Sequence, residues 1–125
     1  MKSELQQNQF KKNNKLSTQI IFTLVFFVST FFSANAQQFE QGMGKALSLW
    51  KEGKSSEASA MFERIASAEK NSWLPNYYVA LINTVDAFYP DNKEKVPALL
   101  TKAQTALYIE LIKQPNNAEI MVMQA

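Results

Sequence analysis

Histidine and cysteine, the side chains that most often act as nucleophiles, bases or metal ligands, are both absent from this chain of 125 residues. Their absence excludes a Ser-His-Asp triad, a cysteine nucleophile, a thiolate zinc site, a haem held by either residue, and a disulfide. Carboxylates could still act in pairs or hold a cation, and the candidates are Glu52, Glu57, Glu63 and Glu69. Their intervals of 5, 6 and 6 residues do not align them on one helix face. We therefore expect solvated charge, no metal, no cofactor and no enzymatic activity.

Aromatic and amide side chains form the better candidate for a binding surface. Asn76, Tyr77 and Asn83 lie off the apolar stripe of a predicted helix, and Trp73 stands next to its start. Asparagine amides can pair with the backbone of an extended peptide whatever its sequence, and partly buried aromatic residues anchor bound peptides. A solvated helix face is the competing interpretation. Trp50, by contrast, falls on an apolar stripe and is expected in the core.

The charged residues indicate no nucleic acid as a partner. Thirteen Lys and Arg stand against eleven Asp and Glu, a formal charge of +2. The first 36 residues hold four of the lysines and one glutamate, so the remainder carries nine basic and ten acidic residues. That remainder has neither a glycine-rich phosphate loop nor a basic patch.

Residues 1–36 have the pattern of a cleaved secretory signal peptide. Four lysines precede an uncharged stretch of 13 residues, 20–32, and Ala34 and Ala36 supply the small side chains that a signal peptidase requires. We expect cleavage before Gln37 and export to the periplasm or the medium, with membrane contact only through the leader. An uncleaved membrane anchor is the alternative, although a span needs about 20 mainly apolar residues. A lipid anchor is excluded because no cysteine can carry it.

Residues 37–125 show helical spacing of apolar side chains throughout, which predicts an all-α domain. The stripe of the first helix consists of Phe39, Met43, Ala46, Leu47 and Trp50. Gly53 supplies the positive φ expected just beyond a helix end. A second helix is predicted over residues 55–68, with Ser55 or Ser56 as its cap. The short connection makes these two helices an antiparallel hairpin.

A second pair of helices follows. The third begins between Ser72 and Pro75 and stops at about Pro90, and its stripe consists of Leu74, Tyr78, Leu81, Ile82, Val85 and Phe88 or Tyr89. The stripe of the fourth consists of Val96, Leu99, Leu100, Ala103, Leu107 and Leu111. The sequence allows two starting points for this fourth helix. Either Pro97 is the first helical residue after a long connector, which we prefer, or Asp91 and Glu94 form a capping box.

Asn117 is predicted to cap a fifth helix, which stops after about two turns at residue 125. Isolated helices this short do not persist in water. We therefore expect its apolar residues, Ile120, Met121, Val122 and Met123, to pack against the fourth helix, and the sequence to be an N-terminal fragment.

The two hairpins together resemble tetratricopeptide repeats (TPRs). The positions that carry the resemblance are Gly53 at the inter-helix turn, Ala58 and Phe62 on the second helix, Ala103 and Leu107 in the second unit, and Pro115-Asn116-Asn117-Ala118-Glu119 at the joint to a third. Ala58 and Ala103 lie 45 residues apart against a family period of roughly 34. The long connector accommodates the excess.

The resemblance implies antiparallel helical hairpins stacked as a TPR-like solenoid, with two units and the start of a third. It also implies that the first helix of each hairpin lines a groove for extended peptides, where Asn76, Tyr77, Asn83 and Trp73 would contribute. We thus expect an exported, non-catalytic scaffold that binds a protein or peptide. The alternatives are the N-terminal helical part of a longer exported enzyme, or a purely structural helical domain.

Overall fold

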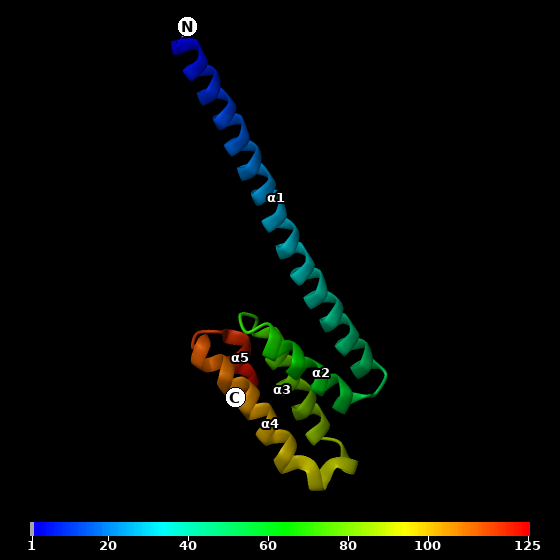
Figure 1. The fold of residues 1–125 in the computed structure, drawn as a ribbon. Coiled ribbons are helices and arrows are strands. Elements are labelled where there is room, and N and C mark those ends of the chain that lie inside the picture. Colours follow the sequence, from blue (N-terminus) through cyan, green and yellow to red (C-terminus); the bar gives the residue numbers. More distant parts are fainter. Residues whose placement is uncertain (1) are drawn as a thin grey trace. The chain divides into compact units, whose positions relative to one another are not determined.

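The computed structural model describes the backbone of residues 2–125, and the side chains of all of these except residues 2, 9–10 and 25–34. Its elements are α1 (Lys2–Lys51), α2 (Ser55–Ala68), α3 (Leu74–Ala87), the 3-10 helix η1 (Pro90–Lys95), α4 (Val96–Lys113) and α5 (Ala118–Gln124) (Figure 1). Every regular element of residues 2–125 is helical, which confirms the all-α part of the predicted fold class. The chain divides into two compact units, Met1–Gln38 and Phe39–Ala125.

The Met1–Gln38 unit holds the N-terminal part of α1 and the predicted leader. Its described side chains are all exposed. Most of the predicted apolar stretch, together with Ala34, belongs to residues 25–34 and lies outside the described side chains. Among the described residues, no helix combines the length and apolarity that crossing a membrane requires. The leader and its cleavage stay predictions.

The turn between α1 and α2 is built around Gly53, as the sequence predicts. Gly53 has a φ of 79°, which residues with a Cβ rarely adopt. Its N–H donates to the Trp50 carbonyl at 2.9 Å, and the Lys54 N–H donates to the Leu49 carbonyl at 2.9 Å. These two bonds satisfy carbonyls that the end of α1 would otherwise leave unpaired, the arrangement known as a Schellman motif.

The predicted serine cap of α2 is wrong. The position before the helix is Lys54, which makes no side-chain cap, and Ser55 and Ser56 lie inside the first turn. The Gly53 turn explains this difference. The hydrogen bond from the Lys54 N–H to the Leu49 carbonyl closes the turn at Lys54, so that α2 begins at the next residue. The hydrogen bond from the Lys54 ammonium to Glu52, aided by the charge of that carboxylate, raises the pKa of Lys54.

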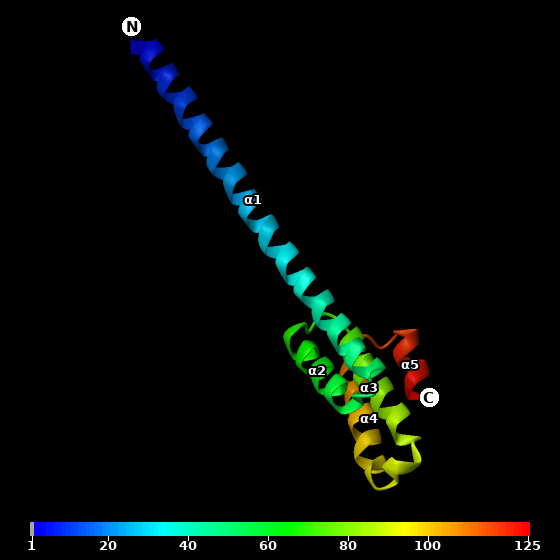
Figure 2. The same ribbon diagram turned by 90° about the vertical axis from the view of Figure 1, so that its right-hand side faces the viewer.

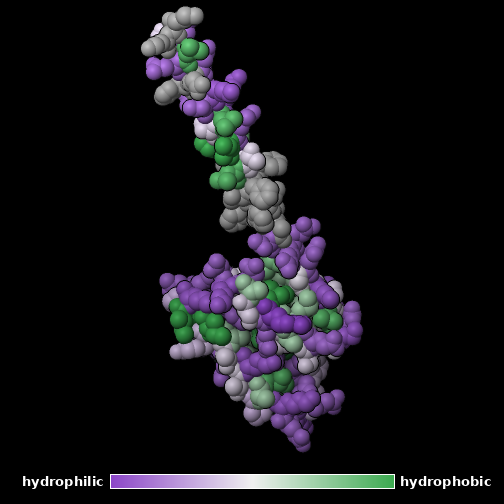
Figure 3. Space-filling model, viewed as in Figure 1, coloured by the Kyte–Doolittle hydropathy of each residue, from purple (hydrophilic) through white to green (hydrophobic). Residues whose placement is uncertain are grey.

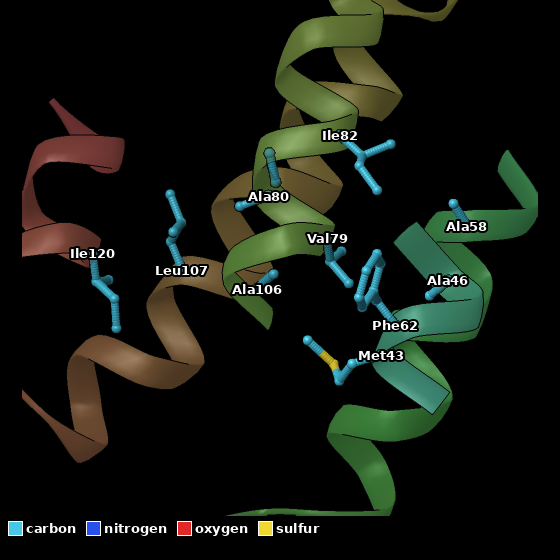
Figure 4. Packing of buried hydrophobic residues seen from close by; sticks show 11 residues of the cluster. Met43, Ala46, Ala58, Phe62, Val79, Ala80, Ile82, Ala106, Leu107 and Ile120 are labelled. Atoms are coloured by element: carbon cyan, nitrogen blue, oxygen red, sulfur yellow. The ribbon is translucent and has the colours of Figure 1, made fainter. Parts of the chain in front are cut away.

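The helices of the first hairpin pack closely within the Phe39–Ala125 unit. A Cβ added at Gly42 would lie 3.3 Å from Cδ1 of Ile65, so the α1 backbone passes directly over this side chain. Ala46 and Ala58 are both fully buried, as small residues at a helix crossing must be. Figure 4 shows Phe62 beside Val79 of α3, with Met43 next to it.

Helix α3 lies between α2 and α4 and contacts both (Figure 2). It therefore buries more than one stripe, and its buried residues are Pro75, Val79, Ala80, Ile82 and Asn83. The prediction that the stripe extends to Phe88 or Tyr89 is wrong. Because α3 ends at Ala87, both residues fall in the turn, where Phe88 is 83% exposed.

The long connector before α4 is confirmed, and the capping box is wrong. Residues 90–95 form η1, and Pro97 lies in the first turn of α4, where its missing N–H costs nothing. Neither η1 nor α4 has a side-chain cap; instead, the Asn92 side chain donates to the Asp86 carbonyl at 2.9 Å. Leu100, predicted on the apolar stripe of α4, is exposed because that stripe turns toward Ala103, Ala106 and Leu107.

Helix α5 begins as predicted, with the Asn117 side chain accepting a hydrogen bond from the Ile120 N–H. Ile120 is fully buried, and α5 contacts both α4 and α3. The expectation that its whole apolar run packs is only partly confirmed. Met123 lies against the core, whereas Met121 and Val122 are exposed.

Candidate functional site

Asn83, predicted to line a peptide groove, lies inside the contact between α2 and α3. It is buried, and its Nδ2 donates to the Ser59 hydroxyl at 2.8 Å and to the Val79 carbonyl at 2.7 Å. An amide engaged in this way joins two helices and satisfies buried polar groups. Asn83 therefore does not share an accessible surface with Asn76, Tyr77 and Trp73.

Asn76 faces α4 instead. Its Nδ2 donates to Oε1 of Glu110 at 2.6 Å, a short bond of the kind expected when the acceptor is charged. The side chain is half-buried and also borders a groove between the helices. Of the four predicted binding residues, Asn76 is the one that this groove includes.

Trp73 and Tyr77 come together at the start of α3. Their rings meet edge to face with centroids 5.6 Å apart, and Tyr77 meets Tyr78 in the same way at 5.8 Å. Tyr78 in turn stacks on Phe62 at 4.9 Å. These four rings form a continuous aromatic cluster from the surface into the core, in which Trp73 and Tyr77 are half-buried. Such pairs contribute about 0.5–1.5 kcal/mol each beyond their buried area.

Glu110 is a buried carboxylate that the sequence analysis missed. Glu110 is only 1% exposed. Besides the hydrogen bond from Asn76, its carboxylate accepts one from the Lys113 ammonium at 3.1 Å. Lys113 also donates to the Lys70 carbonyl, so it links α4 to the segment before α3. The signal was present in the sequence, because Glu110 lies three residues after Leu107 on the buried stripe of α4.

A groove of about 600 Å³ opens beside Asn76, between α4 and the helices α2 and α3. Most of its wall is one face of α4 with short or apolar side chains, and the lining residues are Glu63, Asn76, Val79, Pro97, Ala98, Thr101, Lys102, Thr105, Ala106 and Ile109. An ion pair of 2.8 Å between Lys102 and Glu63 spans from α4 to α2. Both partners are about half exposed, so water screens the pair.

The threonine hydroxyls that line this groove are engaged in hydrogen bonds within α4. Thr101 and Thr105 donate their hydroxyl protons to carbonyls within α4, at 2.7 and 2.8 Å. Within the part of the chain that the structure describes, no three acidic side chains come together in a way that could hold a metal ion. Figure 3 shows a mostly hydrophilic surface for the Phe39–Ala125 unit, interrupted by small hydrophobic patches.

Comparison with known proteins places the chain in no family. No family model, no curated protein and no solved structure matches it. The candidate site is the α4 groove with Asn76 at its edge, together with the Glu110 cluster (Glu110, Asn76 and Lys113) to which Asn76 belongs.

Proposed function

We propose that this chain is an exported, non-catalytic scaffold that binds a protein or peptide through TPR-like stacked hairpins. Two hairpins follow one another, residues 39–68 and 74–113, and α5 packs on the second. Of the positions that the resemblance singles out for packing, Ala58, Phe62, Ala103 and Leu107 are buried, whereas Gly53 at the turn is exposed. Pro115 lies at the exposed joint before α5. This arrangement supports stacking, and the predicted leader supports export.

The α4 groove is the observation that carries the binding function. Its volume of about 600 Å³ lies in the usual range for binding sites. Short side chains at Ala98, Thr101 and Thr105 leave room for the larger side chains of a partner. Ile109, which is 43% exposed, supplies an apolar surface. An apolar segment of a protein or peptide fits this lining, with polar contacts at the Lys102–Glu63 pair.

A purely structural helical domain is the second candidate, and a specific observation favours it. The asparagines expected to line the groove on the first helix of a hairpin form internal hydrogen bonds instead, Asn83 with Ser59 and Asn76 with Glu110. A helix face whose amides are used in this way has less to offer a peptide backbone.

Filling the groove distinguishes the two candidates. A photo-crosslinking side chain placed at Thr101 in the full chain, expressed in its own cells, should trap a partner of defined mass. Thr105→Trp should abolish that crosslink because the indole occupies the groove, whereas Gln104→Trp, on the exposed side of the same helix, should leave it intact.

Thermal unfolding of both variants shows whether they remain folded. The absence of any crosslink at position 101 would favour the structural domain over the scaffold. A crosslink that persists in folded Thr105→Trp would show that the partner does not occupy the groove.

A further inference from the structure

Gln37 becomes the first residue of the exported protein if the leader is cut after Ala36. We propose that this residue is a modification site, where the new N-terminal glutamine closes into a pyroglutamate ring. The inference rests on the proposed export of the chain and names a chemical step that follows it.

The structure places the cut at the edge of the folded unit. Residues 35–38 are exposed, and the compact unit begins at Phe39, which packs against the core. Cleavage before Gln37 therefore removes none of the core residues that the structure describes. It leaves two exposed glutamines, Gln37 and Gln38, ahead of the first packed side chain. The α-amine that cleavage releases and the carboxamide belong to the same exposed residue, Gln37.

The step needs no oxidant, reductant or co-reactant. The α-amino nitrogen of Gln37 attacks its own Cδ, so that an N–Cδ bond forms and the Cδ–Nε2 bond breaks. The amine gives up one proton to the departing nitrogen, which leaves as ammonia. The product is a five-membered lactam. Asparagine at the same position could form only a strained four-membered ring, so it cannot follow this path.

The ring also suits the helix that it precedes. After cleavage, the remaining part of α1, residues 37–51, would begin with a free amine that is mostly protonated at neutral pH. A positive charge is unfavourable at a helix N-terminus, where the dipole is already positive. Lactam formation removes that charge in the way that N-terminal acetylation does. It thereby favours the helix that carries Phe39, Met43 and Ala46 into the core.

Mass spectrometry of the exported protein tests the proposal. The full chain, leader included, is expressed in an exporting cell and lysed directly into acid and denaturant, which limits ring closure during handling. We expect an N-terminal peptide that starts at residue 37, lacks the mass of one ammonia and resists stepwise N-terminal sequencing. Gln37→Asn, which keeps an amide one methylene shorter, should give the same start with a free amine.

The outcomes separate this inference from the export on which it rests. A chain that keeps its leader would overturn both. A chain that starts at residue 37 with an unmodified glutamine would overturn the ring and leave export standing. A start at any other residue would also overturn the ring.

Thermal unfolding supplies a second measurement. Gln37→Asn should melt lower than the wild-type protein by roughly 1–8 °C, whereas Gln38→Asn, which keeps the cyclising residue, should not. Equal melting of all three would overturn the stabilising role of the ring.

Discussion

Phe62 connects the two helical hairpins through a single side chain. It is fully buried on α2, and its ring stacks on Tyr78 of α3 with centroids 4.9 Å apart. Phe88 offers the same side chain at the end of α3, yet it is 83% exposed. The same chemistry therefore stabilises the fold at one position and leaves it unaffected at the other, because only buried apolar area contributes.

Phe62→Ala should lower the free energy of unfolding by about 3–5 kcal/mol, since it removes buried surface and leaves a cavity. Phe88→Ala should change it by less than about 0.5 kcal/mol, as expected for an exposed side chain. Urea unfolding measures both. A loss below about 1 kcal/mol for Phe62→Ala would contradict its place between the hairpins.

Glu110 links α3 to α4 through polar contacts, as Phe62 links α2 to α3 through apolar contacts. Its carboxylate receives Asn76 from α3 and Lys113 from its own helix, and it leaves almost no surface to solvent. Glu110→Ala should cost about 2–3 kcal/mol, chiefly because the Asn76 amide loses its charged acceptor. The Lys113 contribution is smaller, since that side chain is 39% exposed.

Glu94→Ala is the matched control for Glu110, because it removes the same charge from an exposed position on η1. It should shift the urea midpoint by very little. Equal effects of the two substitutions would show that the Glu110 cluster adds no stability of its own.

At the scale of elements, glycines decide where α1 stops and how closely it approaches α2. Gly53 adopts a positive φ, and Gly42 lies against Ile65. Gly44 has neither constraint, since a Cβ added there would meet nothing within 4 Å. Of the three glycines within twelve residues, two therefore have a structural role, one in the turn and one at the helix contact.

Gly53→Ala and Gly44→Ala should therefore have opposite effects. The first should destabilise the protein by about 1–2 kcal/mol, because alanine is strained at this φ even though its Cβ has space. The second should stabilise it by about 0.5–1 kcal/mol, because alanine restricts the unfolded chain and favours the helix. Thermal unfolding monitored by circular dichroism checks the two signs. If both substitutions changed the stability in the same direction, the turn assigned to Gly53 would be contradicted.

At the scale of the whole Phe39–Ala125 unit, α3 is the central element. It contacts α2, α4, η1 and α5, and it carries the largest set of buried residues of any helix in this unit (Figure 2). Helix α5, seven residues long, has one buried residue, Ile120. Elements with few buried contacts open locally at low free energy.

Amide hydrogen exchange should therefore protect α3 most strongly and α5 least, with α2 and α4 between them. Fragment-resolved mass spectrometry of exchanged protein measures this order. Protection of α5 equal to that of α3 would show that α5 is held by contacts beyond those of Ile120 and Met123.

The sequence by itself determined the elements of this protein, because their signals are local. Helical spacing, the glycine after Trp50, the proline near the start of α4 and the asparagine before α5 act within a few residues. The end of α1, both ends of α2 and the starts of α4 and α5 lie close to where these signals predict, whereas α1 begins at Lys2, far ahead of the predicted stripe that starts at Phe39. The tertiary structure alone decided which polar side chains are accessible. Asn76 and Asn83 lie off the apolar stripe, yet they bond to Glu110 of α4 and Ser59 of α2, because a helix between two neighbours has polar residues on both of its contact faces.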